Sequence, residues 1–126
     1  MEKLLYLGMG GFIGTVGRYL VSVSMTGLSR NAFYLGTISV NLIGSLVIGF
    51  LASLFLRDAF VHPGFRLFFI TGMLGGFTTF SSFSFETLKL LQEQRYSEAL
   101  IYVTVSILGG VACAAAGWYL SSFIPR

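Results

Sequence analysis

Residues 72–86 read Gly-Met-Leu-Gly-Gly-Phe-Thr-Thr-Phe-Ser-Ser-Phe-Ser-Phe-Glu, and this stretch decides the fold. A glycine pair is followed by five hydroxyl residues within seven positions, inside an apolar segment of about residues 67–90. A break in a membrane helix is tolerated only where the backbone is buried in protein or lines a cavity. We therefore expect a membrane helix that is broken near mid-membrane. Its freed carbonyl groups are suited to a cation, and its freed amides and hydroxyls to an anion.

The composition of the whole chain agrees with a membrane location. Of 126 residues, 55% are hydrophobic and only 10% are charged, whereas about 25% are charged in soluble domains. A spanning helix needs about 20 mostly apolar residues, so the chain has room for about four. The sequence therefore predicts an all-α integral membrane protein with one four-helix transmembrane domain over residues 1–126. The expected spans are about residues 4–24, 33–56, 67–90 and 99–123.

Basic residues are balanced between the two ends of these spans. The side that holds both termini carries Lys3, Arg57, Arg66 and Arg126, and the opposite side carries Arg30, Lys89 and Arg95, with Arg18 near it. An excess of basic residues on one side normally sets the orientation, and none is present here. We expect a dual-topology chain that forms an antiparallel homodimer. The alternative is that another feature sets a single orientation.

Small residues recur at helical spacing in the first and fourth spans. Gly10 and Gly14 lie four residues apart, and Gly109, Cys113 and Gly117 repeat that spacing. Such patterns allow two helix backbones to approach closely, so we expect helix contacts at both places. Aromatic residues near the span ends are expected to anchor the chain at the membrane interface; they are Tyr6, Tyr34, Tyr96, Trp118 and Tyr119.

The second span carries a stripe of polar and small residues. The stripe repeats every four positions and consists of Thr37, Asn41, Ser45, Gly49 and Ser53. Asn41 has two donors and an acceptor near mid-span, where an unpaired polar group is costly. Either it makes a hydrogen bond to another helix, or it lines a path for a polar solute.

The third span alternates rings and hydroxyls. Phe77, Phe80 and Phe83 recur every three residues, and Ser84 shares a face with the last two if the helix resumes after the break. Aromatic stripes often serve only for packing. The edge of a phenyl ring is electropositive, however, so edges along a narrow path favour an anion without holding it firmly.

Three motifs together resemble the Fluc (CrcB) family of fluoride channels. They are Gly10-Gly11-x-x-Gly14-x-x-x-Arg18-Tyr19, Asn41-Leu42-x-Gly44-Ser45, and Gly75-Gly76-Phe77-Thr78-Thr79-Phe80-Ser81-Ser82-Phe83-Ser84-x-Glu86. The resemblance covers essentially the whole chain. It implies a passive, fluoride-selective channel in the bacterial inner membrane that exports cytoplasmic fluoride and reduces its toxicity. It also implies an antiparallel homodimer with two pores and a structural, non-transported sodium ion at its centre.

The matching positions imply roles for individual residues. The backbone carbonyls of Gly75 and Thr78 would bind the sodium ion. Residues of the fluoride path would be Thr37, Asn41, Phe80, Ser81, Ser82, Phe83, Ser84, Tyr102 and Ser106. On the fourth span this polar track stops at Gly110 and Ala114, where relatives continue with hydroxyls. Arg18 and Glu86 also match, either at an entrance or in a structural role; for Arg18 the plain alternative is an arginine that reaches the membrane interface.

Other functions find less support. A small proton-coupled multidrug exporter also has about four spans, but it needs a membrane-embedded carboxylate, and Glu86 is the only candidate. A structural subunit of a larger membrane complex is a third class. We expect no enzyme and no catalytic residue, because the only histidine, His62, falls in a turn without a nucleophile beside it. The isolated positive charges do not predict nucleic-acid binding.

Overall fold

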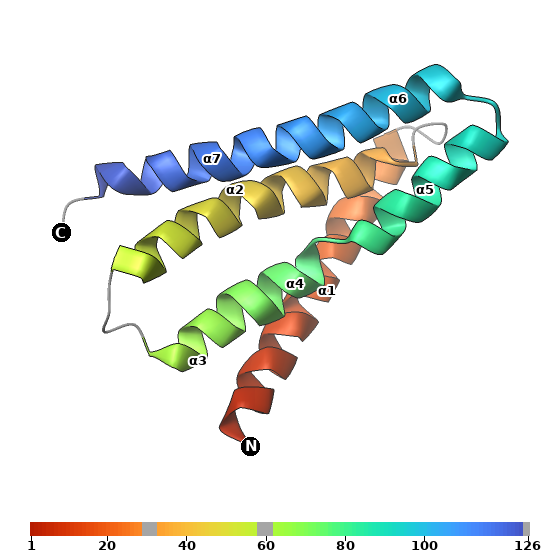
Figure 1. Ribbon diagram of the computed structural model, residues 1–126. Coiled ribbons are helices and arrows are strands. Elements are labelled where there is room, and N and C mark those ends of the chain that lie inside the picture. The colour runs from red at the N-terminus through yellow and green to blue at the C-terminus, as the bar shows by residue number, and fades with distance from the viewer. Residues whose placement is uncertain (29–32, 58–61, 125–126) are drawn as a thin grey trace.

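The computed structural model describes residues 1–28, 33–57 and 62–124, and within them every regular element is helical. The elements in chain order are α1 (Glu2–Leu28), α2 (Leu35–Arg57), α3 (Pro63–Arg66), η1 (Leu67–Leu74), α4 (Gly75–Phe77), α5 (Phe80–Gln92), α6 (Tyr96–Thr104), η2 (Val105–Gly109), α7 (Gly110–Leu120) and η3 (Ser121–Phe123). They form four long rods (Figure 1). The first two rods are α1 and α2. The third rod consists of α3, η1, α4 and α5 in succession, and the fourth rod consists of α6, η2, α7 and η3.

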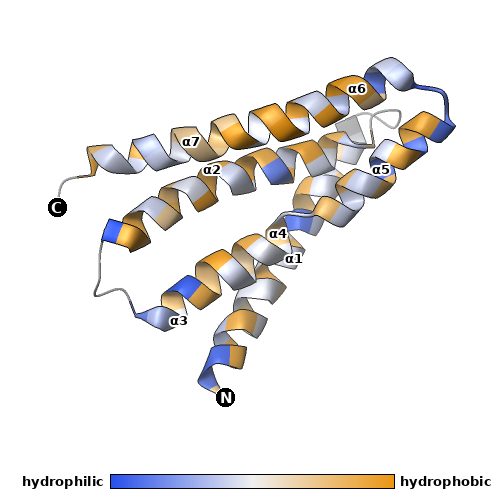
Figure 2. Ribbon diagram, in the orientation of Figure 1, coloured by the Kyte–Doolittle hydropathy of each residue, from blue (hydrophilic) through white to orange (hydrophobic). Residues whose placement is uncertain are grey.

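Four helices are long and apolar enough to cross a membrane, as predicted. They cover Glu2–Gly27, Leu35–Arg57, Pro63–Gln92 and Tyr96–Phe123. Three of them begin before the predicted spans, and the second begins two residues later because Phe33 and Tyr34 form a turn. Figure 2 shows hydrophilic residues mainly at helix ends and at the turn between α5 and α6. Arg30 and Arg126, which entered the charge balance, lie outside the described residues.

Glycine contacts hold the helices together in two places. A Cβ atom at Gly14 would overlap the carbonyl oxygen of Met73 in η1, so α1 lies with its backbone directly against the third rod. A Cβ atom at Gly117 would likewise overlap the carbonyl oxygen of Leu46, which brings α7 equally close to α2. Both contacts involve the small-residue patterns of the first and fourth spans, and only glycine allows this approach.

The third rod is interrupted after α4. Thr78 (φ −84°, ψ 158°) and Thr79 (φ −153°, ψ 120°) have extended backbones, and α5 begins at Phe80. The interruption lies within the glycine and hydroxyl stretch for which a break was predicted. Two segments of wider π-helix also occur, η1 before the break and η2 in the fourth rod. Such widened turns are rare in proteins, and those that occur are often found at functional sites.

The best-buried cluster lies where α5, α6 and the start of α2 meet. Leu90 and Tyr102 are fully buried there, and Ala99 almost so. Phe33, Tyr34, Ile38 and Phe83 pack against them. This cluster fixes the end of α5 against α6, and α5 carries the predicted pore phenylalanines.

Candidate functional site

Asn41 of α2 pairs with the interruption of the third rod. Its Nδ2 donates to the carbonyl oxygen of Thr79 (3.1 Å), and the Thr79 N–H donates to its Oδ1 (2.8 Å). One side chain thus bonds both backbone polar groups of Thr79, whose N–H donates to it in place of a helical carbonyl. Asn41 therefore makes the interhelical hydrogen bond that the sequence left as one of two interpretations.

Thr79 is also the N-cap residue of α5, directly before its first residue, Phe80. Its Oγ1 accepts from the N–H of Ser82 (3.2 Å), as an N-cap hydroxyl does. The same Oγ1 bonds the hydroxyls of Ser81 (3.1 Å) and Ser82 (3.2 Å). The hydroxyl of Ser84 donates to the carbonyl oxygen of Phe80 (3.0 Å) within α5. The three predicted path serines of the third rod are therefore bonded within their own segment.

The interruption changes the surroundings of two backbone carbonyls. In a continuous helix the N–H of Thr79 would donate to Gly75, and that of Ser82 to Thr78, because each N–H bonds the carbonyl four residues earlier. Here these two amides donate to the side chains of Asn41 and Thr79 instead. The carbonyl oxygens of Gly75 and Thr78 thereby lose their usual helical donors.

A cavity of about 400 Å³ lies between α2, the third rod and η2. It is lined by Asn41, Gly44, Ser45, Ile48, Ile70, Leu74, Gly75, Thr78, Thr79, Phe80, Phe83, Ser106 and Ile107. The two π-helical segments supply four of these residues, Ile70, Leu74, Ser106 and Ile107. Six predicted site residues are brought together on this lining: Asn41, Gly75, Thr78, Phe80, Phe83 and Ser106.

Ser106 is the chemically informative member of the lining. Among the residues described, its Oγ is the one buried side-chain oxygen or nitrogen without a hydrogen-bond partner. A buried hydroxyl without a partner is costly in a folded protein unless a ligand or water completes it. The rings of Phe80 and Phe83 are 5.6 Å apart, and no Lys, Arg or His occurs among these lining residues. The cavity thus offers neutral hydrogen-bonding groups beside two phenylalanine rings.

Glu86 joins three helices beside this cavity. Its carboxylate accepts hydrogen bonds from Tyr102 Oη (2.6 Å) and Thr37 Oγ1 (2.9 Å), which come from α6 and α2. Within the described residues its partners are hydroxyls and not a cation. Three predicted site residues, Thr37, Glu86 and Tyr102, therefore meet in one cluster that lies off the cavity lining.

The sequence left the role of one residue open and did not assign two others to the site. Arg18 is half-buried on α1 and is not part of the cavity lining or of the Glu86 cluster. Thr79 was not singled out, although threonine is among the residues preferred at a helix N-cap and follows the predicted break. Tyr34 was expected only as an interfacial anchor, but its ring lies 5.2 Å from that of Tyr102.

Comparison with known proteins identifies relatives of this chain. Residues 5–118 match the family described as CrcB-like protein, Camphor Resistance (CrcB). The fluoride-specific ion channel FluC of Helicobacter pylori strain J99 is 47% identical over 93% of this chain and 91% of its own length. FluC of Azobacteroides pseudotrichonymphae is 38% identical over 98% of both chains, and FluC 1 of Moorella thermoacetica is 44% identical over 93% of this chain and 84% of its own. With four apolar helices and this similarity over nearly its full length, the chain is a multi-pass membrane protein that belongs to the CrcB family.

Proposed function

We propose that this chain forms a passive, fluoride-selective ion channel that exports fluoride from the cytoplasm and reduces its toxicity. The observation that carries the proposal is the buried Ser106 hydroxyl, which has no hydrogen-bond partner among the described residues and lies in a cavity that also contains Asn41 and two phenylalanine rings. The relatives named as fluoride-specific channels support the same conclusion.

The chemistry of the lining suits a small anion. Fluoride is tightly hydrated, so a selective path must replace its water with compact donors such as a hydroxyl or an amide N–H. Ring edges of Phe80 and Phe83 add weak positive potential, which attracts an anion yet lets it leave. A negative-inside membrane potential drives an anion outward at about 2.3 kcal/mol per 100 mV, so no coupling residue is needed.

A second, antiparallel copy of the chain belongs to this proposal. Phe80 lines the cavity but is 78% exposed in a single chain. A cavity that contains polar groups and opens toward lipid is unfavourable, because lipid offers these groups no hydrogen bonds. A second copy would cover it, and the even distribution of basic residues allows that copy to insert in the opposite orientation.

A structural sodium ion fits the donor set at the interruption. The carbonyl oxygens of Gly75 and Thr78 have lost their usual helical donors, and hard cations prefer such oxygens. Among the described residues no group of three or more His, Cys, Asp or Glu side chains could hold a metal ion. When bound, the ion would supply positive charge between the interruptions of two copies.

Halide efflux from liposomes tests the main proposal. Purified protein is reconstituted in sodium-containing buffer, a potassium ionophore removes the opposing voltage, and electrodes record fluoride and chloride. We expect rapid fluoride release without chloride release, and a deletion strain that stops growing at lower fluoride concentrations. Absence of fluoride release, or equal release of chloride, would refute the proposal.

The dimer and the sodium ion have separate tests. A Gln94→Cys substitution in a Cys113→Ala background places the only thiol at the turn between α5 and α6, which dual topology exposes on both sides of the membrane. We expect a membrane-impermeant reagent to label about half of it from each side. Labelling from one side only would refute dual topology. Replacement of sodium by a large organic cation should abolish fluoride release, and unchanged release would refute the sodium site.

One observation keeps a proton-coupled multidrug exporter as a second candidate. Glu86 is half-buried among three helices, as an exporter's embedded carboxylate would be. The channel proposal predicts fluoride release that continues without a proton gradient. Drug-dependent proton uptake that is lost in Glu86→Gln would instead establish the exporter.

A further inference from the structure

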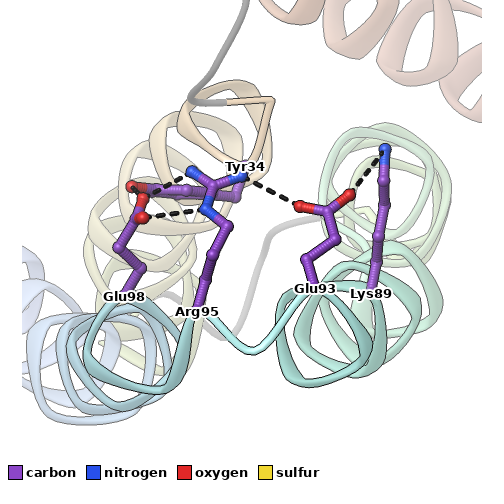
Figure 3. A network of polar contacts seen from close by, with 5 residues as sticks. All are labelled: Tyr34, Lys89, Glu93, Arg95 and Glu98. Atoms are coloured by element: carbon purple, nitrogen blue, oxygen red, sulfur yellow. Dashed lines mark hydrogen bonds and ion pairs between the residues drawn. The ribbon is translucent and has the colours of Figure 1, made fainter.

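A polar network closes the turn between α5 and α6 beside the start of α2. It consists of Tyr34, Lys89, Glu93, Arg95 and Glu98, which Figure 3 shows from close by. Arg95 lies at its centre, with Nε 2.8 Å from Glu98 Oε1, Nη2 2.6 Å from Glu98 Oε2 and Nη1 3.1 Å from Glu93 Oε2. Because Arg95 donates two parallel hydrogen bonds to Glu98, the orientation of that carboxylate is fixed.

The backbone and an aromatic ring fix Arg95 itself. Gln94 adopts a left-handed conformation (φ 58°), and the N–H of Arg95 then donates to the carbonyl oxygen of Leu90 (2.9 Å). The guanidinium and the ammonium group of Lys89 lie over the ring of Phe33, at 5.8 and 4.2 Å from its centre. The network is therefore attached both to the turn and to the segment that precedes α2.

Tyr34 connects this network to the Glu86 cluster. Its hydroxyl donates to Glu98 Oε2 (2.8 Å), and its ring lies 5.2 Å from that of Tyr102. Burial, and then the hydrogen bond to Glu98, raise the pKa of Tyr34 above its ordinary value, so the hydroxyl stays a donor at neutral pH. The ring of Tyr102 is completely buried and also contacts Phe83, again at 5.2 Å. It is thus held between Tyr34 and a predicted pore residue.

We propose that Tyr34, anchored by Glu98 and Arg95, is a positioning residue of the ion path: it holds the ring of Tyr102 against Phe83 and so maintains the Tyr102–Glu86 hydrogen bond. Its effect on transport rests on the proposed channel function, whereas its effect on Tyr102 does not. Tyr34 itself is not part of the cavity lining and acts through Tyr102.

Removal of single hydroxyl and carboxylate groups tests the proposal. Tyr34→Phe keeps the ring but releases it from Glu98, and we expect fluoride efflux to fall about three- to tenfold, as the loss of one ordinary hydrogen bond allows. Glu98→Gln should lower efflux in the same direction and serves as the second variant if Tyr34→Phe does not fold. Tyr96→Phe and Glu93→Gln are matched controls at the same turn, because Tyr96 is 62% exposed and Glu93 leaves the Arg95–Glu98 pair intact. Their efflux should match that of the unsubstituted protein.

A double-mutant cycle separates positioning from a general loss of structure. If Tyr34 acts through Tyr102, Tyr34→Phe should have almost no further effect in a Tyr102→Phe background. A purely structural contribution would add to that of Tyr102→Phe. Additive losses would therefore overturn the proposal, even if both single variants are less active.

Magnetic resonance of ring-labelled tyrosine gives a readout that is independent of transport. The chain has six tyrosines, so the signal of Tyr102 can be assigned from its loss in Tyr102→Phe. We expect Tyr34→Phe to shift this signal and Tyr96→Phe to leave it in place. An unshifted Tyr102 signal would overturn the positioning role. If the unsubstituted protein releases no fluoride, the channel proposal fails. The Tyr102 signal still decides whether Tyr34 positions Tyr102.

Discussion

Two helix contacts of this protein are built on opposite principles. Where α1 meets η1 and α4, Gly10 and Gly14 bring backbone against backbone with no room for a side chain. Where α2 meets the interruption of the third rod, the amide of Asn41 reaches across and a cavity remains. The first contact depends on glycine having no side chain, and the second depends on the hydrogen bonds of the Asn41 side chain.

The difference follows from the state of the backbone at each place. In η1 the helical backbone satisfies its own polar groups, so α1 needs to supply only a smooth surface. At Thr78 and Thr79 the backbone is extended, and although the N–H of Thr78 still donates to Leu74, the N–H of Thr79 needs an acceptor from another helix. The close contact holds the third rod in place, and the side-chain contact holds the interruption open next to the cavity.

The largest expected effect comes from filling the close contact. Gly14→Ala places a methyl group on the carbonyl oxygen of Met73, and we expect the free energy of unfolding to fall by about 3 kcal/mol. Gly8→Ala is the control, because a Cβ there meets no atom within 4 Å. Thermal unfolding in detergent measures both. Equal stability of the two variants would show that the contact is not as close as described.

Loss of the amide at the interruption should come next. Asn41→Ala removes the partner that bonds the N–H and the carbonyl oxygen of Thr79, which is expected to lower the free energy of unfolding by about 1–3 kcal/mol. Fluoride efflux should fall by about tenfold or more, since the cavity loses its amide donor. Ser39→Ala, whose hydroxyl bonds only the carbonyl oxygen of Leu35 in its own helix, is the control. Wild-type stability of Asn41→Ala would mean that this pairing does not hold the interruption.

Two serines of the predicted path should then behave differently. Ser106→Ala removes a hydroxyl that has no protein partner among the described residues, so stability should not change while fluoride efflux falls by about three- to tenfold. Ser84→Ala removes a hydroxyl that bonds the carbonyl oxygen of Phe80 in α5, and efflux should stay within about twofold. Parallel efflux and unfolding measurements compare the pair. If both variants lose efflux equally, Ser84 also contributes its hydroxyl to the ion path.

The smallest expected effect is a loss of stability at alkaline pH. The pKa of Tyr34 is raised above 10.0 by burial and by its hydrogen bond to Glu98, so the folded state favours the neutral phenol. This contribution is complete below pH 10.0, and it is lost as the pH rises from there through the raised pKa. Thermal midpoints at pH 8 and above pH 10 should therefore differ less in Tyr34→Phe than in the unsubstituted protein. A midpoint difference unaltered by this substitution would contradict the raised pKa.

Much of the architecture could be predicted from residue type and spacing. Long apolar runs predict helices in a membrane because lipid leaves backbone groups no other partner, and four such helices are present. Gly75 and Gly76, followed by hydroxyl residues, predicted an interruption close to where it occurs. The glycine patterns around Gly14 and Gly117 predicted close helix contacts. The structure confirms both, because a Cβ atom at either glycine would overlap the backbone of the neighbouring helix. The dimer, the sodium ion and the ion path itself stay predictions.

Partnerships between side chains were not readable in the same way. The predicted path contained Ser81, Ser82, Ser84 and Ser106, yet of these four only Ser106 lines the cavity, with its hydroxyl unpaired among the described residues. The other three bond within their own segment because Thr79 begins a helix there and α5 offers a nearby carbonyl. Residue type says that a hydroxyl can donate, and local backbone geometry decides to what.

The sequence by itself determined a four-helix membrane protein with an interruption in the third rod, because both depend on interactions that are local along the chain or with lipid. Only the tertiary structure decided that Asn41 satisfies Thr79, that Glu86 meets Thr37 and Tyr102, and that Tyr34 joins Glu98 to the ring of Tyr102. These pairs come from helices far apart in sequence. Which of them meet depends on how closely the glycine contacts bring the helices together and on the rotation of each helix about its axis.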